Sequence, residues 1–259
     1  TGAKTPYVEP WMRWHHLIGL VAAAFIFTWI FSGLMSMNPL GVFSSTREAI
    51  DSGRYRGGTV AVDGALGEPA ALLAAVDDAR FKPVEIQWRR IDGELFAVLL
   101  DGQGETRIVS GSDGHLQVAR LLPAAWLQQK VRALSDAPVQ GYWVQLAADA
   151  YFYPRAPEAM NGAAVRRFPV AVADFGDAEA TRVYLDLATG DPLLTMGRRE
   201  RVGRWLFYFL HSWDLPAMLR QDIARLAVLL LLSLAGAALC ATATVIGYRR
   251  LRMKLRRRR

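Results

Sequence analysis

The feature that most constrains this chain is an apolar run near its C-terminal end. No charged residue occurs from Leu226 to Tyr248, and a helix of about 23 residues is about 34 Å long. Because the hydrocarbon core of a bilayer is about 30 Å thick, this run predicts a transmembrane helix. Eight lysines and arginines follow between Arg249 and Arg259. Such a basic flank is kept on the cytoplasmic side of a membrane, so we expect this tail in the cytoplasm.

A second uncharged run extends from Leu17 to Met37 and is also long enough to span a bilayer. Lys4 and Arg13 precede it, so we expect the N-terminal flank in the cytoplasm as well. With both termini on one side, the residues between the two spans lie on the other side. We therefore predict a protein of the bacterial inner (cytoplasmic) membrane with a periplasmic central domain.

Aromatic and basic residues are interspersed just before the C-terminal span. Trp205, Phe207, Tyr208 and Trp213 occur here among several arginines. This mixture is typical of an amphipathic helix that lies in the membrane interface. We expect such a helix over residues 198–225.

The basic character of the chain comes from its C-terminal tail, because the formal net charge is +7 and the tail alone holds eight cations. We interpret this charge as a topology signal and a contact with anionic lipid, and we expect no nucleic-acid partner. The single cysteine, Cys240, excludes an intrachain disulfide and a cysteine zinc site. The sequence also lacks a P-loop, a nucleophile elbow, an HExxH motif and a dinucleotide fingerprint. We therefore assign no catalytic residue.

The central residues show a helical pattern followed by short strands, twice in succession. Glu68-Pro69 opens the first helical pattern, and the second begins at Leu121. Asp-Gly pairs at residues 92–93, 101–102 and 113–114 separate or follow apolar runs, as in hairpins. We expect a further turn at residues 189–192 (TGDP). The strands expected in this region are Val84–Trp88, Leu95–Leu100, Thr106–Ser110, Val139–Leu146, Tyr151–Tyr153, Phe168–Asp174 and Thr181–Leu187.

These patterns together predict an α+β membrane protein. Two transmembrane helices flank a periplasmic domain made of two tandem helix-plus-antiparallel-sheet units. The predicted segments are a flank and first span at 1–37, two periplasmic units at 38–118 and 119–197, an interfacial helix at 198–225, a second span at 226–248 and a basic tail at 249–259.

Three motifs resemble those of a known family. Arg13–Gly19 (RWHHLIG) is similar to a His-x-x-[Leu/Ile]-Gly opening of a membrane helix, with His15 in the histidine position. Thr181–Gly190 (TRVYLDLATG) is similar to the end of a PepSY unit, and Arg204–Pro216 (RWLFYFLHSWDLP) resembles the segment before the family's final span. Their order resembles that in bacterial PepSY-associated transmembrane proteins, often described as iron-regulated membrane proteins. The resemblance implies that the two periplasmic units are PepSY-like.

Members of this family usually carry more than two membrane spans, and this sequence begins at Thr1 without a methionine. We therefore expect the chain to be a C-terminal portion of a longer member, with further spans upstream.

Histidines near the membrane are the candidate cofactor ligands. His15 and His16 precede the first span on its cytoplasmic side, and His211 precedes the second span on its outer side. Neutral imidazole is a suitable ligand for iron. The resemblance implies haem b, because some relatives are haem-bearing ferric-siderophore reductases. About 30 Å separates the two histidine positions across a span, so each would need a second axial ligand from another helix, a second copy or a partner. Alternatively, the histidines are polar anchors at the level of the lipid headgroups.

Two functional hypotheses follow. In the first, the chain is part of a haem-dependent ferric reductase that carries electrons across the bilayer, with no metal other than the haem iron. In the second, the central domain is a non-enzymatic module that binds a peptide, a protease or another envelope partner. The sequence leaves the substrate and the electron donor open.

Overall fold

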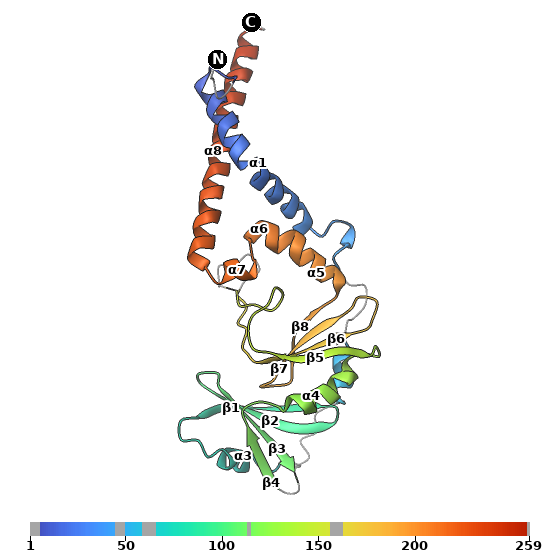
Figure 1. The fold of residues 1–259 in the computed structure, drawn as a ribbon. Coiled ribbons are helices and arrows are strands. Elements are labelled where there is room, and N and C mark those ends of the chain that lie inside the picture. The colour runs from blue at the N-terminus through green and yellow to red at the C-terminus, as the bar shows by residue number, and fades with distance from the viewer. Residues whose placement is uncertain (1–5, 45–49, 59–65, 113–114, 156–162, 258–259) are drawn as a thin grey trace. The chain divides into compact units, whose positions relative to one another are not determined.

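The computed structural model describes residues 6–44, 50–58, 66–112, 115–155 and 163–257. The chain forms two compact units, and Figure 1 shows the elements of each. The helical unit comprises Thr1–Phe43 and Val202–Arg259, and the sheet unit comprises Ser44–Arg201. The predicted mixed α+β class is confirmed, with antiparallel sheets between two long apolar helices.

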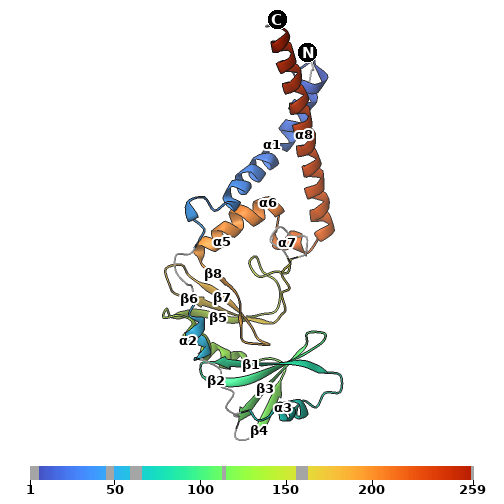
Figure 2. The ribbon, with the colours of Figure 1, turned by 180° about the vertical axis from the view of Figure 1, so that it is seen from behind.

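Two long helices dominate the helical unit: α1, Pro10–Ser36, and α8, Asp222–Arg256. Both are long and apolar enough to cross a membrane. They lie side by side near the two chain ends and diverge away from those ends (Figures 1 and 2). Glu9 accepts a hydrogen bond from the backbone N–H of Met12, and Pro10 occupies the first turn, so α1 begins before the uncharged run. Lys4 and the last two arginines lie outside the described residues.

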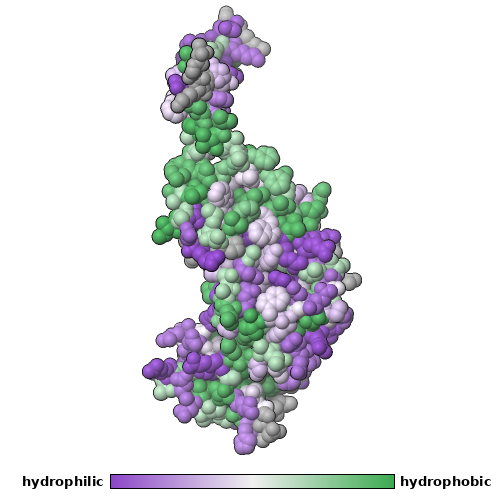
Figure 3. Space-filling view, in the orientation of Figure 1, coloured by the Kyte–Doolittle hydropathy of each residue, from purple (hydrophilic) through white to green (hydrophobic). Residues whose placement is uncertain are grey.

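Large apolar side chains cover the outside of α1 and α8. Figure 3 shows hydrophobic residues along these helices and hydrophilic residues at the end that holds the termini. The side chains of Leu20, Phe27 and Ile30 on α1 are about 70% exposed, and Leu226 and Leu231 on α8 are similarly exposed. A surface of this kind is consistent with contact to lipid, because apolar side chains gain little from facing water.

The segment between the sheet unit and α8 is divided into short elements where the sequence predicts one interfacial helix. These are α5, Arg198–Arg204; a π-helical turn, η3, Trp205–Phe209; α6, Leu210–Ser212; and α7, Pro216–Leu219. Trp213 adopts a left-handed backbone conformation that ends α6, and Pro216 starts a new helix at its first turn.

The sheet unit contains two four-stranded antiparallel sheets in which consecutive strands are neighbours. The first sheet consists of β1, Pro83–Ile91; β2, Glu94–Asp101; β3, Thr106–Ser112; and β4, His115–Ala119. The second consists of β5, Val139–Gln145; β6, Val170–Phe175; β7, Arg182–Asp186; and β8, Pro192–Met196. The expected turns at 92–93 and 101–102 connect strands, whereas Asp113-Gly114 lies outside the described residues.

Short helices accompany the two sheets. They are α2, Ser52–Arg56; α3, Pro69–Ala75; α4, Ala124–Lys130; and the 3₁₀ turn η2, Val131–Leu134. Another 3₁₀ turn, η1, Pro39–Gly41, follows α1 in the helical unit. The expected strand at Tyr151–Tyr153 is absent. Asp149 accepts hydrogen bonds from the backbone N–H groups of Tyr151 and Phe152, which bends the chain into a turn.

The two sheets share their largest core. Phe96, Val98 and Ile108 of the first sheet belong to one buried cluster with Ala171 and Val183 of the second. Helices α2, α4 and η2 add four further side chains to this cluster, from Tyr55, Leu127, Val131 and Leu134. The two tandem halves are therefore joined into one compact unit by apolar burial.

Candidate functional site

His15 lies on α1 and is held by a side chain of α8. Its Nδ1 is 2.9 Å from the hydroxyl oxygen of the buried Thr242. That hydroxyl also lies 3.0 Å from the carbonyl oxygen of Ala238 and 2.9 Å from that of Leu239, both in its own helix. A hydroxyl has one proton to donate and two lone pairs. When that proton goes to a helix carbonyl, the oxygen accepts from the tautomer of His15 that carries its proton on Nδ1, and Nε2 then keeps its lone pair.

Close approach of the two helices makes this contact feasible. Gly19 follows His15 by one helical turn, and a Cβ atom there would lie 3.3 Å from a methyl group of Leu239. A larger residue would push α1 away from α8 and lengthen the hydrogen bond to Thr242.

His211, on α6, is held in the same way from α1. Its Nδ1 lies 3.0 Å from the hydroxyl of the fully buried Ser32, which donates to the carbonyl of Trp29 at 3.1 Å. When the Ser32 proton goes to that carbonyl, the matching tautomer of His211 carries its ring proton on Nδ1 and its lone pair on Nε2. Burial lowers the pKa of His211, which favours the neutral imidazole.

Aromatic rings fix the orientation of His211. The indole of Trp29 stacks on the imidazole with 5.5 Å between ring centroids, and Phe207 lies 5.4 Å away. The indole N–H of Trp29 also donates to the backbone carbonyl of His211 at 2.9 Å. The π-helical turn η3 directly precedes α6, and π-turns occur frequently at functional sites.

His16 is placed differently from the other two. Its ring meets the ring of Tyr7 edge-on at 5.3 Å. Within the described part of the chain, no hydrogen bond engages either of its ring nitrogens. His16 therefore lacks the hydroxyl partner that His15 and His211 have.

His15 and His211 lie at opposite ends of the helical unit. His15 and Ser32, the partner of His211, are on one continuous helix and are about 26 Å apart along its axis. One haem cannot bridge both histidines. Among the described residues, no group of three or more His, Cys, Asp or Glu side chains is arranged to hold a metal ion. The donor chemistry of each imidazole fits iron, and any further ligand would come from outside this pair.

A buried charge cluster supports the segment that carries His211. Arg225 of α8 donates to a carboxylate oxygen of Asp214 at 3.1 Å and to the carbonyl of Ser212 at 3.2 Å. Arg204 of α5 is also buried and donates to the backbone carbonyl of Asp214. We did not predict this cluster from the sequence. Its only signal is the presence of charged residues directly before an apolar span.

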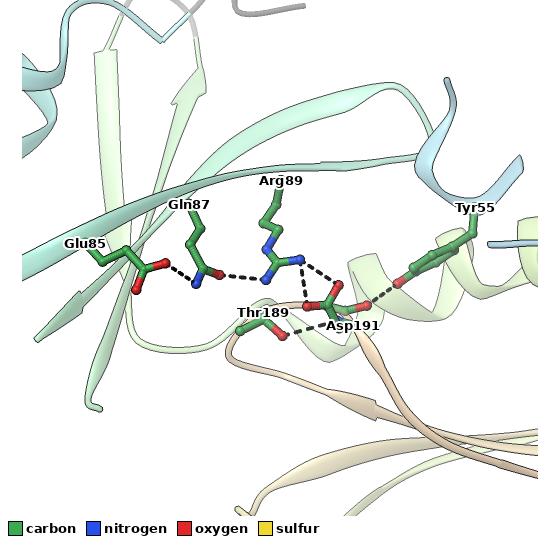
Figure 4. A network of polar contacts seen from close by, with 7 residues as sticks. Tyr55, Glu85, Gln87, Arg89, Thr189 and Asp191 are labelled. Atoms are coloured by element: carbon green, nitrogen blue, oxygen red, sulfur yellow. Dashed lines mark hydrogen bonds and ion pairs between the residues drawn. The ribbon is translucent and has the colours of Figure 1, made fainter. Parts of the chain in front are cut away.

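The sheet unit contains a second polar cluster, shown in Figure 4. Arg89 of β1 bonds both carboxylate oxygens of Asp191, at 2.9 and 3.1 Å, and donates to Gln87 at 2.6 Å. The hydroxyl of Tyr55 on α2 donates to the carbonyl of Gly190 at 2.8 Å. The sequence indicated only a turn at residues 189–192, because the partner strand and helix are distant along the chain.

This cluster borders a pocket of about 520 Å³. The pocket lies where α2 and β1 meet β8, the edge strand of the second sheet. Its lining includes Ser52, Arg56, Arg89, Asp191 and Thr195. It therefore offers two guanidinium groups, one carboxylate and two hydroxyls to a ligand.

No protein-family model matches this chain, and no curated protein sequence matches it closely enough to count as a relative. Among solved structures, the chain is similar to the YpmB protein from Bacillus subtilis, at 13% identity over 50% of this chain and 96% of that one. The TM-score of this match is 0.19.

Proposed function

We propose that the helical unit is embedded in the cytoplasmic membrane and that the sheet unit, made of two PepSY-like halves, lies on the periplasmic side. Support comes from the exposed apolar surfaces of α1 and α8 and from the basic end of α8. Arg249, in that basic end, pairs with Glu9 at 2.8 Å, so the two cytoplasmic flanks would be joined. A fluorescent protein fused after Arg259 should be active in the cytoplasm. Activity of a periplasm-dependent reporter at that position would overturn this topology.

Within this topology, we propose that His15 and His211 would each hold a haem b, at opposite faces of the membrane. The observation that carries this proposal is the hydroxyl partner at Nδ1 of each imidazole. A ligating histidine usually donates its second ring N–H to a neighbouring acceptor, which fixes the tautomer and raises the basicity of the ligating nitrogen. Ser32 and Thr242 provide that acceptor, and Nε2 is then available to iron.

Bound haem would supply one-electron transfer, and the chain would be a component of transmembrane electron transfer to a ferric complex. The protein's own contribution would be to hold two imidazoles in fixed orientation near the two faces of an apolar layer. Low polarity around His211, provided by Trp29 and Phe207, would also limit access of water to that ligand. A second copy of the chain or further transmembrane helices would provide the remaining ligands.

The test is a reduced-minus-oxidised visible spectrum of the full chain purified with haem supplied during expression. The wild type should show a b-type band, and His15→Ala and His211→Ala should each lower the haem content. His115→Ala, which removes a histidine from the sheet unit, is the matched control. A wild type without a haem band, or a double variant of His15 and His211 that keeps the wild-type haem content, would reject the proposal.

A second candidate function is a binding module in the sheet unit, which would act without catalysis on a peptide or other envelope ligand. The observation that favours it is the polar pocket at the edge of β8. Edge strands offer unpaired backbone groups, and pockets beside them can select side chains or chain termini. This function does not require haem, so the visible spectrum does not test it. A ligand-binding measurement tests it instead.

A further inference from the structure

The pocket beside β8 carries a more specific inference, which deepens the binding-module function. Its polar wall has unequal charge. Asp191 is neutralised by Arg89 through both carboxylate oxygens. The guanidinium of Arg56, by contrast, makes no hydrogen bond or ion pair with any residue in the described part of the chain. The pocket therefore presents one positive charge that its own side chains do not compensate.

Another part of the pocket lining is apolar. Ile50, Pro192, Leu193 and Leu194 line it, and all four are half-buried. An apolar ligand group would remove these side chains from water, at about 25 cal/mol for each Å² buried. A ligand that fits both the polar and the apolar lining therefore combines one negative charge with a short aliphatic group.

The chemistry of the polar wall favours a carboxylate over a phosphate. A single guanidinium can donate two parallel N–H groups to the two oxygens of a carboxylate. The hydroxyls of Ser52 and Thr195 line the same pocket and can donate further hydrogen bonds. A dianionic phosphate would bring two negative charges to the single uncompensated guanidinium of Arg56, so one of its charges would stay unpaired.

We propose that this pocket binds a carboxylate that bears a short aliphatic side chain, either as a free small molecule or as the C-terminus of a peptide. Arg56 is the residue that recognises the carboxylate. Arg89 and Asp191 form the polar wall beside it, and the hydroxyl of Tyr55 holds the turn that carries Asp191 in place through Gly190.

Titration calorimetry on the full chain in detergent micelles tests the proposal. The probes are N-acetyl-leucine, its neutral amide, inorganic phosphate and acetyl-Ala-Ala-Leu with a free C-terminus. N-acetyl-leucine should bind saturably, and the amide and phosphate should bind at least about tenfold more weakly, as expected for loss of a charged hydrogen bond. Tighter binding of the peptide would identify a chain terminus as the ligand, and weaker binding would identify a free small carboxylate.

Variants connect the binding to the pocket. Arg56→Gln should weaken the binding of N-acetyl-leucine by about tenfold. Because Arg56 is exposed, the fold should be unaffected. Arg90→Gln is the control, since Arg90 neighbours Arg89 on β1 and projects from the opposite face. Equal affinity for the acid and its amide would reject the ligand class while leaving a binding pocket. Absence of binding by every probe, or equal affinities of the two variants, would reject the site itself.

Discussion

The imidazole of His211 lies 3.0 Å from the hydroxyl of Ser32, and this contact ties the short helix α6 to the long apolar helix α1. Ser32 is fully buried, so its hydroxyl has no water to replace the histidine. The Ser32 hydroxyl also lies within hydrogen-bond distance of the carbonyl of Trp29, so it can donate there while it accepts from His211. The pair of His15 and Thr242 repeats this arrangement at the other end of α1.

If His211 holds haem as proposed, Ser32→Ala should weaken haem binding there by about 10-fold to 100-fold, the usual effect of removing the partner of a metal-bound histidine. The imidazole would lose the acceptor that keeps its proton on Nδ1. Haem titration of the purified apo-protein, followed by visible absorbance, measures the change. Ser36→Ala is the control, because Ser36 lies one turn further along α1 and its exposed hydroxyl, among the residues that the structure describes, bonds the carbonyl of Gly33 alone. Equal haem affinities of the two variants would contradict this role for Ser32.

The sequence sufficed to identify the histidines but not their partners. Uncharged runs and motif order singled out His15 and His211, since both signals are local. Thr242 is 227 positions from His15, and Ser32 is 179 positions from His211. Serine and threonine are common in apolar helices, so nothing in a single sequence distinguishes these two. Their roles depend on how α1 packs against α8 and α6.

A similar limit applies to the sheet unit. The Asp-Gly pairs at 92–93 and 101–102 predicted turns correctly, because a hairpin turn depends on local backbone preference. The last strand, β8, was missed because Pro192 follows directly after a turn motif and was assigned to that turn. A proline at the first position of an edge strand donates no ladder hydrogen bond and is tolerated there. Without β8, the pocket beside it could not be predicted from the sequence.

Tyr55→Phe should destabilise the sheet unit by about 1–2 kcal/mol. Tyr55 is 2% exposed, and its hydroxyl satisfies the buried carbonyl of Gly190, which would be left without that donor. Hydrogen exchange of the β7 and β8 amides in the full chain measures the loss. Tyr142→Phe is the comparison, because its hydroxyl bonds the carbonyl of Ala124 at a half-exposed position where water can substitute. Equal losses of protection in the two variants would show that burial does not increase the contribution of the Tyr55 hydrogen bond to stability.

Gly190→Ala should destabilise the same unit by about 2 kcal/mol or more. Gly190 has a φ of +77°, and a Cβ atom there would lie 2.2 Å from Cδ1 of Ile91 and 3.1 Å from Leu122. The strain of a left-handed backbone then adds to overpacking of the core. Gly93→Ala separates the two effects, because Gly93 has a φ of +82° and a Cβ atom there would meet no heavy atom within 4 Å. It should cost only about 1 kcal/mol. Hydrogen exchange measures both effects, on the β2 amides for Gly93→Ala and on the β7 amides for Gly190→Ala. An equal loss of protection in the two variants would contradict the packing argument.

The ion pair between Asp78 and Arg107 should make the first sheet sensitive to acid. Arg107 donates to the carboxylate of Asp78 at 2.6 Å, and this hydrogen bond holds the pKa of Asp78 below its ordinary value. The unfolded chain therefore binds a proton at a higher pH than the folded chain does. The pair stabilises the fold above the ordinary carboxyl pKa of about 3.9, and this stabilisation is lost as the pH falls through the lower pKa of the folded state.

Asp78→Asn should accordingly lower the urea midpoint at pH 7, and the gap between variant and wild type should shrink as the pH falls below about 4. Protection of the β2 and β3 amides against hydrogen exchange, measured across the urea series, follows the unfolding of this sheet. Asp77→Asn is the matched control, because the neighbouring Asp77 forms no ion pair with any described residue, and its midpoint should follow the wild type at every pH. A gap for Asp78→Asn that stays constant from about pH 7 to well below the ordinary carboxyl pKa of about 3.9 would show that the carboxylate charge of Asp78 does not stabilise the fold.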